Sequence, residues 1–306
     1  MDIAATAAHA LTAGESIPGR VRHAPGGVAR NVAENLARLG HAVRLVSAVG
    51  DDLLGQSLLQ ATHSAGVDVE GCFVLPGRAS GAYVSLQGAD GEMALAVNDM
   101  DIMDALTPER LAVHAAQLRD ACAIVLDCNL PPAALQWLFA QPRKGPVFAD
   151  AVSSVKAARL RPWLAQVHTL KVDRAEAQAL CGMPVQSLEQ ARSAAAWFVD
   201  QGVRLLALTL GAQGVCWHAA NGASGLQAAP AVQVVNASGA GDALLAGLVH
   251  AHMAGDAPKQ ALPFAMACAA LTLGSEAANH PEMSVAAVRA LMADRPTSFL
   301  AAKSAA

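Results

Sequence analysis

Residues 239–242, Gly-Ala-Gly-Asp, stand directly before the apolar residues of a helical repeat, ALLAGLV. This spacing places Gly239, Ala240 and Gly241 in the first turn of a helix, where backbone N–H groups have no partner within the helix. Small residues let an anion approach these groups closely, so the pattern is typical of a phosphate site. The carboxylate of Asp242 would repel a bound phosphate, so its position requires a compensating function. A substrate hydroxyl beside Asp242 supplies one, because the carboxylate can accept its proton while the amides stabilise charge on a transferring phosphoryl group.

A second glycine pair, Gly26 and Gly27, precedes another helical repeat, VARNVAENLARL. Asn31 lies in the first turn of that repeat and carries an amide side chain able to bind two hydroxyls. A Gly-Gly helix start taken alone is more often a tight turn. Two glycine-led helices in one chain favour the functional interpretation.

The elements that position these residues follow from the pattern around them. Strand-like runs alternate with helical repeats over most of the chain, which predicts a doubly wound, mostly parallel α/β sheet flanked by helices. In such sheets ligands collect at the carboxyl ends of the strands. Residues 72–98 interrupt the alternation with short strand-like runs, so we expect a small β-flap inserted in a single domain that spans residues 1–306.

Composition excludes several classes of partner. The net charge of −4 leaves no basic excess of the kind that nucleic-acid binding requires. The six cysteines are scattered without a CxxC pair, which favours a reducing, cytoplasmic setting. No apolar run reaches the roughly 18 residues of a membrane span, and the first residues lack the basic region of a signal peptide.

Together these motifs resemble the ribokinase-like, PfkB-type family of sugar and nucleoside kinases. Its first signature is matched by GGVARNVA (26–33), followed by Gly40 and Gly50, and its second by NASGAGDA (236–243). Segments such as AVGDDLLGQSLL, VNDMDI, VLDCN and HTLKVDRAEA are most similar to one group of nucleoside kinases in that family. The resemblance implies a ribokinase-like fold and an ATP-dependent transfer to an alcohol, with Mg²⁺ as a cofactor.

The resemblance also implies roles for individual residues. Asp242 would be the catalytic base for a ribose 5′-hydroxyl, with the amides of residues 239–241 as the anion hole. The acceptor would be held by Asp2, Gly26, Gly27, Asn31, Asn98, Asp99, Asn129 and Lys156, although a solvated surface lysine explains Lys156 equally well. The nucleotide would lie against Thr209, Gly211 and Gly214. Glu176 and Asp173 would hold Mg²⁺ through water, and Asn236 and Ser238 would bind a potassium-like cation.

The sequence departs from the family pattern at Asp173, Ala237 and Ala151 and at its first residues, and the changes at Ala237 and Ala151 remove no catalytic atom. Asp173 replaces an asparagine, which exchanges an amide donor for a carboxylate that only accepts once ionised. The family opens with a buried strand that leads to an Asn-x-Asp motif, whereas this sequence begins Met1-Asp2-Ile3. Without that strand we expect exposed strand edges and a loss of apolar cover. A misassigned start explains this better than a damaged enzyme, and Asp2 would then be either a ribose ligand or a frayed terminal residue.

Several alternatives stay open at this point. The acceptor could be ribose, inosine or guanosine, or the chain could be a catalytically silent ligand-binding protein with the kinase fold. A Rossmann-type dehydrogenase is disfavoured because no GxGxxG follows a first strand, and a P-loop is disfavoured because no GK[ST] follows the glycines. The apolar alternation of the expected flap permits a homodimer through it.

Overall fold

The main sheet of the protein is a mixed sheet. The computed structural model describes residues 1–90, 92–294 and 299–301, and the sheet has the strand order β13-β12-β11-β10-β9-β8-β7. The parallel part consists of β7 (Ile124–Asp127), β8 (Val147–Asp150), β9 (Thr169–Val172) and β10 (Leu205–Thr209). The antiparallel part consists of β11 (Val215–Ala219), β12 (Ser224–Gln227) and β13 (Phe299–Ala301). The expected α/β fold is confirmed, but the sheet is mixed rather than mostly parallel, because the short turns after β10 and β11 can join only antiparallel neighbours.

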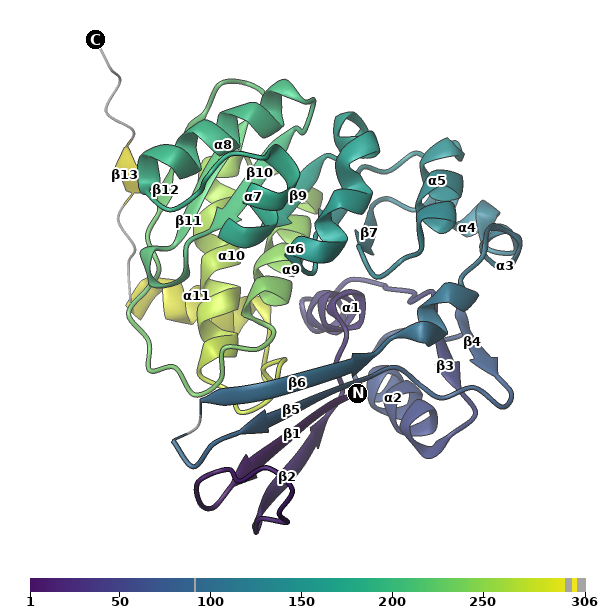
Figure 1. Cartoon of the computed structure of the whole chain (residues 1–306). Helices are drawn as coiled ribbons and strands as arrows, with labels where there is room; N and C mark the ends of the chain where they lie inside the picture. Colours follow the sequence, from purple (N-terminus) through teal and green to yellow (C-terminus); the bar gives the residue numbers. More distant parts are fainter. Residues whose placement is uncertain (91, 295–298, 302–306) are drawn as a thin grey trace.

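Helices cover both faces of this sheet (Figure 1). One layer contains α5 (Pro132–Ala140), α7 (Arg174–Cys181) and α8 (Leu188–Asp200). The opposite layer contains α1 (Val28–Arg38), α9 (Ala240–Met253), α10 (Pro258–Leu273) and α11 (Val285–Asp294). Alternate residues of β10 show the division, since Leu206 and Leu208 pack with the first layer whereas Leu205 and Ala207 pack with α9 and α10.

Shorter elements connect these layers. They include α2 (Leu53–Ser64), α3 (Pro108–Ala112), α4 (Ala115–Asp120), α6 (Ser154–Ala157) and the 3₁₀ helices η1 (Asp101–Ala105), η2 (Ala158–Gln166) and η3 (Gly211–Gln213). Residues 107–118, TPERLAVHAAQL, do not form one continuous helix but contribute to both α3 and α4. None of the helices in the described part of the chain combines the length and apolarity that crossing a membrane requires.

A separate four-stranded sheet, here called the lid, lies across the molecule from α7 and α8 (Figure 1). Its strand order is β2-β1-β5-β6, with β1 (Asp2–Ala7), β2 (Gly19–Ala24), β5 (Ala82–Gln87) and β6 (Met93–Asp99). This corrects the flap expected over residues 72–98. Residues 72–75 form β4 (Cys72–Leu75), which pairs with β3 (Ser47–Gly50) outside the lid, and the first residues of the chain supply half of the lid instead.

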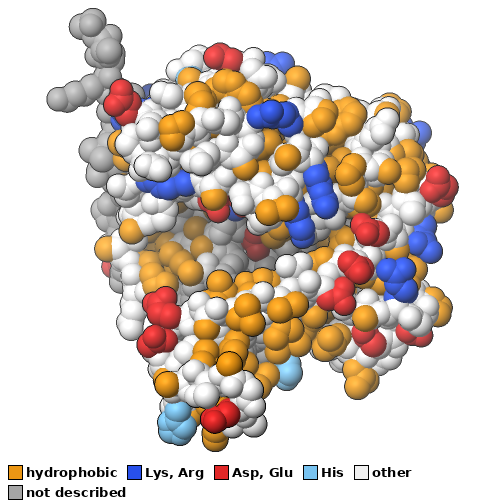
Figure 2. Space-filling model, in the orientation of Figure 1, with side chains coloured by type: hydrophobic (Ala, Val, Ile, Leu, Met, Phe, Trp, Pro, Cys, Tyr) orange, Lys and Arg blue, Asp and Glu red, His pale blue; other side chains and the backbone are white. Residues whose placement is uncertain are grey.

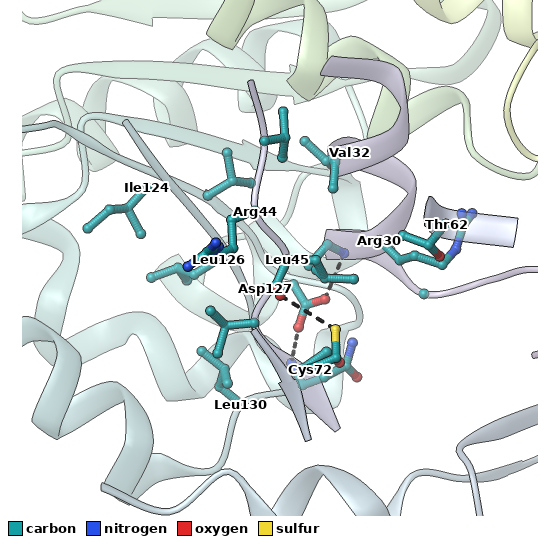
Figure 3. Close-up of a pocket in the computed structure, with 18 of the residues that line it drawn as sticks. Arg30, Val32, Arg44, Leu45, Thr62, Cys72, Ile124, Leu126, Asp127 and Leu130 are labelled. Carbon is teal, nitrogen blue, oxygen red and sulfur yellow. Dashed lines mark hydrogen bonds between the residues drawn. The ribbon is translucent and has the colours of Figure 1, made fainter. Parts of the chain in front are cut away.

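An apolar cavity of about 490 Å³ lies between β3 and β7 and reaches the lid (Figure 3). Its lining includes Leu45 and Val46 just before β3, Ile124 and Leu126 of β7, and Met1. Within the described residues β7 pairs only with β8, and β3 pairs only with β4. The cavity therefore lies between two strand edges that have no partner among the described residues.

Candidate active site

The first turn of α9 presents free backbone amides at the end of a buried helix. Gly239 caps the helix with a φ of 79°, and no side chain caps its first amides. A Cβ on Gly239 would lie 1.8 Å from the carbonyl oxygen of Ala278, so only glycine fits here. Ala240 and Gly241 follow as the first helical residues, as the sequence predicts. The arrangement can hold an anion at the helix N-terminus.

Asp242 lies in that first turn and is 8% exposed. Its Oδ2 accepts a hydrogen bond of 2.7 Å from Nδ2 of Asn31, a residue of the other glycine-led helix. Burial and, to a smaller extent, the nearby charge of Asp150 raise the pKa of Asp242 to about 7, although the bond from Asn31 opposes the rise. A carboxyl group with a pKa near neutrality is suited to accept a proton at physiological pH.

Sequence reasoning missed a lysine beneath this turn. Lys171 of β9 has a side chain that is only 12% exposed, and its Nζ lies 3.0 Å from Oδ2 of Asp150 at the end of β8. The position of a Cβ on Gly241 is 2.9 Å from the same Nζ, which places the ammonium directly against the first turn of α9. Burial alone would lower the pKa of Lys171, but the carboxylates of Asp150, Glu176 and Asp242 hold it above its usual value. The signal available in the sequence was a charged residue inside a buried parallel strand, HTLKV.

The second glycine pair forms the wall of the same region. Gly27 caps α1 with a φ of 101°. A Cβ on Gly26 would lie 2.2 Å from Oδ1 of Asp2, so the glycine allows the loop to pack against that carboxyl group. Asp2 belongs to β1 and is paired on both sides, so it is not a frayed residue. The structure thus brings Asp2, Gly26 and Gly27 together along the cavity.

Asp127 joins this wall to the end of β7. Its Oδ2 accepts a bond of 3.0 Å from the backbone N–H of Ala29, and its Oδ1 accepts one of 2.8 Å from the N–H of Asn129. Burial raises its pKa above the usual range. Nζ of Lys156 donates to Oδ1 of Asn129 at 2.6 Å, so Lys156 is directed toward the site rather than into solvent. Sequence reasoning did not single out Asp127, although it ends a strand directly before Asn129.

Asn98 and Asp99 lie at the end of β6, away from these contacts. Both are exposed, and neither lines the cavity. Oδ1 of Asp99 accepts a bond of 3.3 Å from the N–H of Asp101, a local contact of the chain leaving the lid. The structure therefore places them on the lid without joining them to the other acceptor residues.

The residues assigned to the nucleotide and to Mg²⁺ lie at the carboxyl ends of β9 and β10. Thr209 ends β10, and Gly211 and Gly214 adopt positive φ angles of 61° and 96° in the turn that follows. Asp173 and Glu176 form a capping box at the start of α7, in which each carboxylate accepts a backbone bond of 2.8 Å from the other residue. Burial raises the pKa of Glu176 to about 7, and Lys171 opposes that rise. One or two carboxylates are the protein ligands that Mg²⁺ bound to a nucleotide ordinarily takes, so these residues fit that ion.

Asn236 and Ser238 lie in the loop before α9. Oδ1 of Asn236 accepts a bond of 2.9 Å from the N–H of Ser238, and its Nδ2 donates at 2.9 Å to the carbonyl of Glu276. This loop therefore packs against the chain that follows α10. Ser238 is exposed. The contacts fix the loop that leads into the Gly239 cap.

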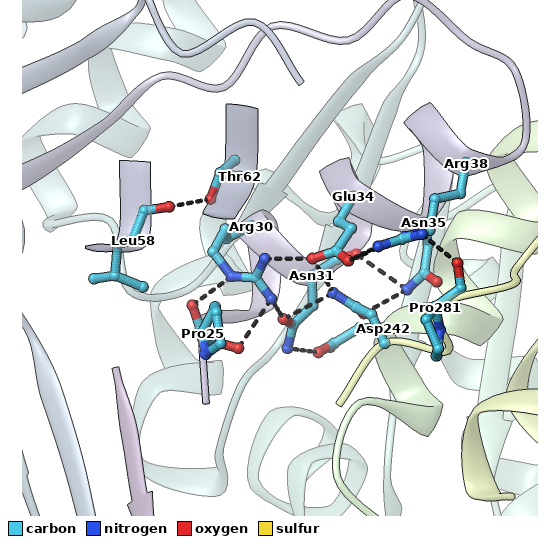
Figure 4. A network of polar contacts seen from close by, with 12 residues as sticks. Pro25, Arg30, Asn31, Glu34, Asn35, Arg38, Leu58, Thr62, Asp242 and Pro281 are labelled. Carbon is cyan, nitrogen blue, oxygen red and sulfur yellow. Dashed lines mark hydrogen bonds and ion pairs between the residues drawn. The ribbon is translucent and has the colours of Figure 1, made fainter. Parts of the chain in front are cut away.

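The cavity reaches Asp2 of the lid, the Gly26–Gly27 loop, and Asp127 and Asn129 at the end of β7. Figure 2 shows a hollow between the lid and the rest of the molecule, with hydrophobic side chains along the lid. Figure 4 shows Asn31 and Asp242 facing one another where α1 and α9 meet. An alcohol held at the glycine loop and a phosphoryl group held at α9 would meet beside Asp242.

Comparisons with known proteins agree with this geometry. A family model described as pfkB family carbohydrate kinase matches residues 2–284. Pseudouridine kinase of Escherichia coli (strain K12) is 40% identical over 292 residues, which are 95% of this chain and 93% of that protein. A putative sugar kinase from Clostridium perfringens has 27% identity and a TM-score of 0.84, covering 98% of this chain and 95% of that one. A putative ribokinase II from E. coli in complex with ATP and Mg²⁺ has 20% identity and a TM-score of 0.81, covering 96% and 97% of the chains, and supports the fold alone.

Proposed function

Because the chain belongs to the pfkB family of carbohydrate kinases, we propose that it transfers the γ-phosphoryl group of ATP to the 5′-hydroxyl of pseudouridine. The products are pseudouridine 5′-phosphate and ADP. The identity of 40% to a pseudouridine kinase, over nearly the full length of both chains, supports this acceptor. The sequence motifs of the acceptor side, from GGVARN to VLDCN, support it as well.

The observation that carries the proposal is the place of Asp242. Its carboxylate is buried in the first turn of α9, beside amides that no side chain caps. In the proposed reaction Asp242 accepts the proton of the 5′-hydroxyl while that oxygen bonds to the γ-phosphorus and the bond to ADP breaks. The N–H groups at residues 239–241 stabilise charge on the phosphoryl oxygens during the transfer.

The acceptor binds at the wall formed by the glycine loop. Asp2 and the amide of Asn31 bind the ribose hydroxyls, with Gly26 and Gly27 leaving room for the ring. Asn129, held by Lys156, binds the base from the end of β7. Asn98 and Asp99 approach only from the lid, so their contribution requires the lid to move toward the site.

The nucleotide binds across the turn at Thr209, Gly211 and Gly214. Asp173 and Glu176 hold Mg²⁺ through water, and this ion supplies neutralising charge to the phosphates when bound. Asn236 and Ser238, next to the Gly239 cap, contribute to a potassium-like site that steadies the anion hole.

The lid also supports an association of two copies. Its strands expose Val21, Val84, Met93, Leu95 and Val97, an unusual number of large apolar side chains for one small sheet. We propose a homodimer through this surface in a cytoplasmic enzyme. Light scattering is expected to give twice the chain mass, and Leu95→Lys with Val97→Glu is expected to give the chain mass. A wild-type monomer would contradict the dimer without touching the catalytic proposal.

An acceptor panel tests the function. ADP release is measured with ATP, Mg²⁺ and pseudouridine, uridine, ribose, inosine or guanosine, and the highest kcat/KM is expected with pseudouridine. A preference for ribose, inosine or guanosine would overturn the acceptor but keep the kinase. Calorimetric binding of pseudouridine and ATP without turnover would identify the catalytically silent protein instead.

A further inference from the structure

A buried polar network links the glycine loop to Asp242 through α1 (Figure 4). Its centre is Arg30, which is 7% exposed. The guanidinium donates from Nε to the carbonyl of Gly26 at 2.9 Å, from Nη2 to the carbonyl of Pro25 at 3.1 Å, and from Nη1 to Oε2 of Glu34 at 2.6 Å. Nη2 also donates to Oδ1 of Asn31. One side chain therefore contacts the acceptor loop and the residue that bonds to the catalytic carboxylate.

Asn279, from the loop between α10 and α11, reaches the same oxygen from the other side. Its Nδ2 donates to Oδ1 of Asn31 at 3.3 Å and to Oε2 of Glu34 at 2.8 Å. Its own Oδ1 accepts a bond of 2.8 Å from Nδ2 of Asn35. The amide of Asn279 is thus oriented at both ends, so its nitrogen must face Asn31.

These contacts decide which way the amide of Asn31 points. An asparagine amide has one accepting and one donating end, and either could in principle face Asp242. Arginine donates only, and Asn279 presents its nitrogen, so the oxygen of Asn31 must face them. Its nitrogen is then left to donate to Asp242, as the bond of 2.7 Å shows.

We infer that Arg30 and Asn279 are positioning residues that hold Asn31 with its nitrogen toward Asp242 and that Arg30 ties this amide to the Pro25–Gly26 loop. The inference rests on the proposed role of Asp242 as the base. It assigns a role to an arginine that the proposed function leaves without one. Because the same guanidinium fixes both the acceptor loop and Asn31, it also fixes the position of the acceptor loop relative to Asp242.

The proton affinity of Asp242 reports on this arrangement. The charged groups that face it are Asp150 of β8 and Asp127 of β7, which raise its pKa, and Lys171 of β9, which lowers it. The bond from Asn31 on α1 also lowers it. If the amide turns away, that bond is lost and the pKa of Asp242 rises. A hydrogen bond to a charged group corresponds to a shift of about one unit.

The experiment is a titration of the protein without substrates. Aspartate labelled with ¹³C at the carboxyl carbon is followed by NMR, and the signal of Asp242 is assigned by its loss in Asp242→Asn. Arg30→Lys keeps the charge but cannot serve four acceptors at once, so a rise of about one unit is expected. Asn31→Ala should give the same rise, and the double variant Arg30→Lys with Asn31→Ala should add nothing further.

Two more variants keep the test decisive. Arg38→Lys is the matched control, because Arg38 also lies on α1 and also binds Glu34, at 2.9 Å, but has no contact with Asn31. In the Arg38→Lys variant the pKa of Asp242 should equal that in the wild type. If Arg30→Lys does not fold, Asn279→Ala removes the other donor to Asn31 while Glu34 keeps both arginine partners, and a rise is again expected.

The inference is overturned if the folded variants of Arg30 and Asn279 leave the pKa of Asp242 where it is, or if Arg38→Lys moves it equally. The outcome of the titration can be distinguished from the outcome of the activity test. A shifted titration in a protein that phosphorylates no acceptor would reject the proposed activity and retain the positioning role. An active wild type, together with no shift of the Asp242 pKa in the variants, would retain the proposed activity and reject the positioning role.

Discussion

Nδ2 of Asn31 donates a hydrogen bond of 2.7 Å to Oδ2 of Asp242 across a separation of 211 positions in the chain. Each residue lies near the start of a glycine-led helix, Asn31 on α1 and Asp242 on α9. The bond therefore joins the two motifs that carry the chemistry in the sequence. It places the residue proposed to bind the acceptor against the residue proposed to take its proton.

Activity should rise with pH through neutrality. Burial raises the pKa of Asp242 to about 7, and the reaction requires its ionised form. Below that pH the protonated carboxyl cannot accept the hydroxyl proton, so log kcat/KM should fall with a slope of about one per pH unit. The profile is measured with pseudouridine between pH 5 and 9. A profile that stays flat from pH 5 to 7 would remove Asp242 from the role of base.

Replacing the base should stabilise the protein at high pH. The pKa of Asp242 is raised on folding from 3.8 to about 7, so the folded state binds the proton more tightly and loses stability as the pH rises through this window. Asp242→Asn should therefore increase the free energy of unfolding by about 1–4 kcal/mol at pH 8, and by less at pH 4. Urea unfolding at both pH values checks this. The control is Asp256→Asn, an exposed residue just after the far end of α9, which should change little.

Lys171 should be essential for the stability of the site. Lys171→Met leaves the buried carboxylate of Asp150 without its partner at 3.0 Å, and breaking a buried pair in this way costs about 3–5 kcal/mol. Denaturant unfolding at pH 8 measures the loss. Lys144→Met is the matched control, because Lys144 pairs with Asp120 at an exposed position and should cost less than about 1 kcal/mol. Equal losses in the two variants would show that the buried pair has no special importance.

Gly26→Ala should weaken binding of the acceptor and leave binding of ATP unchanged. Its Cβ would lie 2.2 Å from the carboxyl group of Asp2 and displace it. Loss of a charged hydrogen bond to the ribose should raise the KM for pseudouridine by about 10–100-fold and leave the KM for ATP unchanged. Gly274→Ala is the control, since its Cβ would meet nothing closer than 3.5 Å. An unchanged KM for pseudouridine would show that Asp2 does not bind the ribose.

The cavity between β3 and β7 should accept an added strand. A chain extended before Met1 by about seven apolar, strand-forming residues can pair with both free edges and fill the space of about 490 Å³. The melting temperature should rise by roughly 5 °C or more, because each buried aliphatic side chain contributes about 1.5–3 kcal/mol. A glycine-serine extension of the same length is the control. Equal melting temperatures would show that the cavity does not take a strand.

The fold class and the two helix starts were predictable because they depend on local signals. The glycines at positions 27 and 239 and the apolar repeats after them define helices whatever surrounds them. The lid was predicted with the wrong strands, because pairing depends on partners far along the chain. Residues 72–75 form a strand as expected, but they pair with β3, and β1 pairs with β5 across about 80 positions.

The supporting residues of the site were harder to predict for the same reason. Lys171 and Asp127 act through partners that only the folded chain brings near. Arg30 follows the glycine pair within the recognised motif, yet nothing in its spacing shows that it reaches two carbonyls and an amide. Asn279 lies far from any motif and has no signal in a single sequence.

The most direct test is the product formed from ATP and pseudouridine by the wild type and by Asp242→Asn, analysed by ³¹P NMR. We expect one phosphomonoester on the 5′-oxygen from the wild type, and a rate about 10²–10⁴-fold lower in the variant. A phosphate on another hydroxyl, or an undiminished rate in Asp242→Asn, would contradict the assignment of Asp242 as the base for the 5′-hydroxyl.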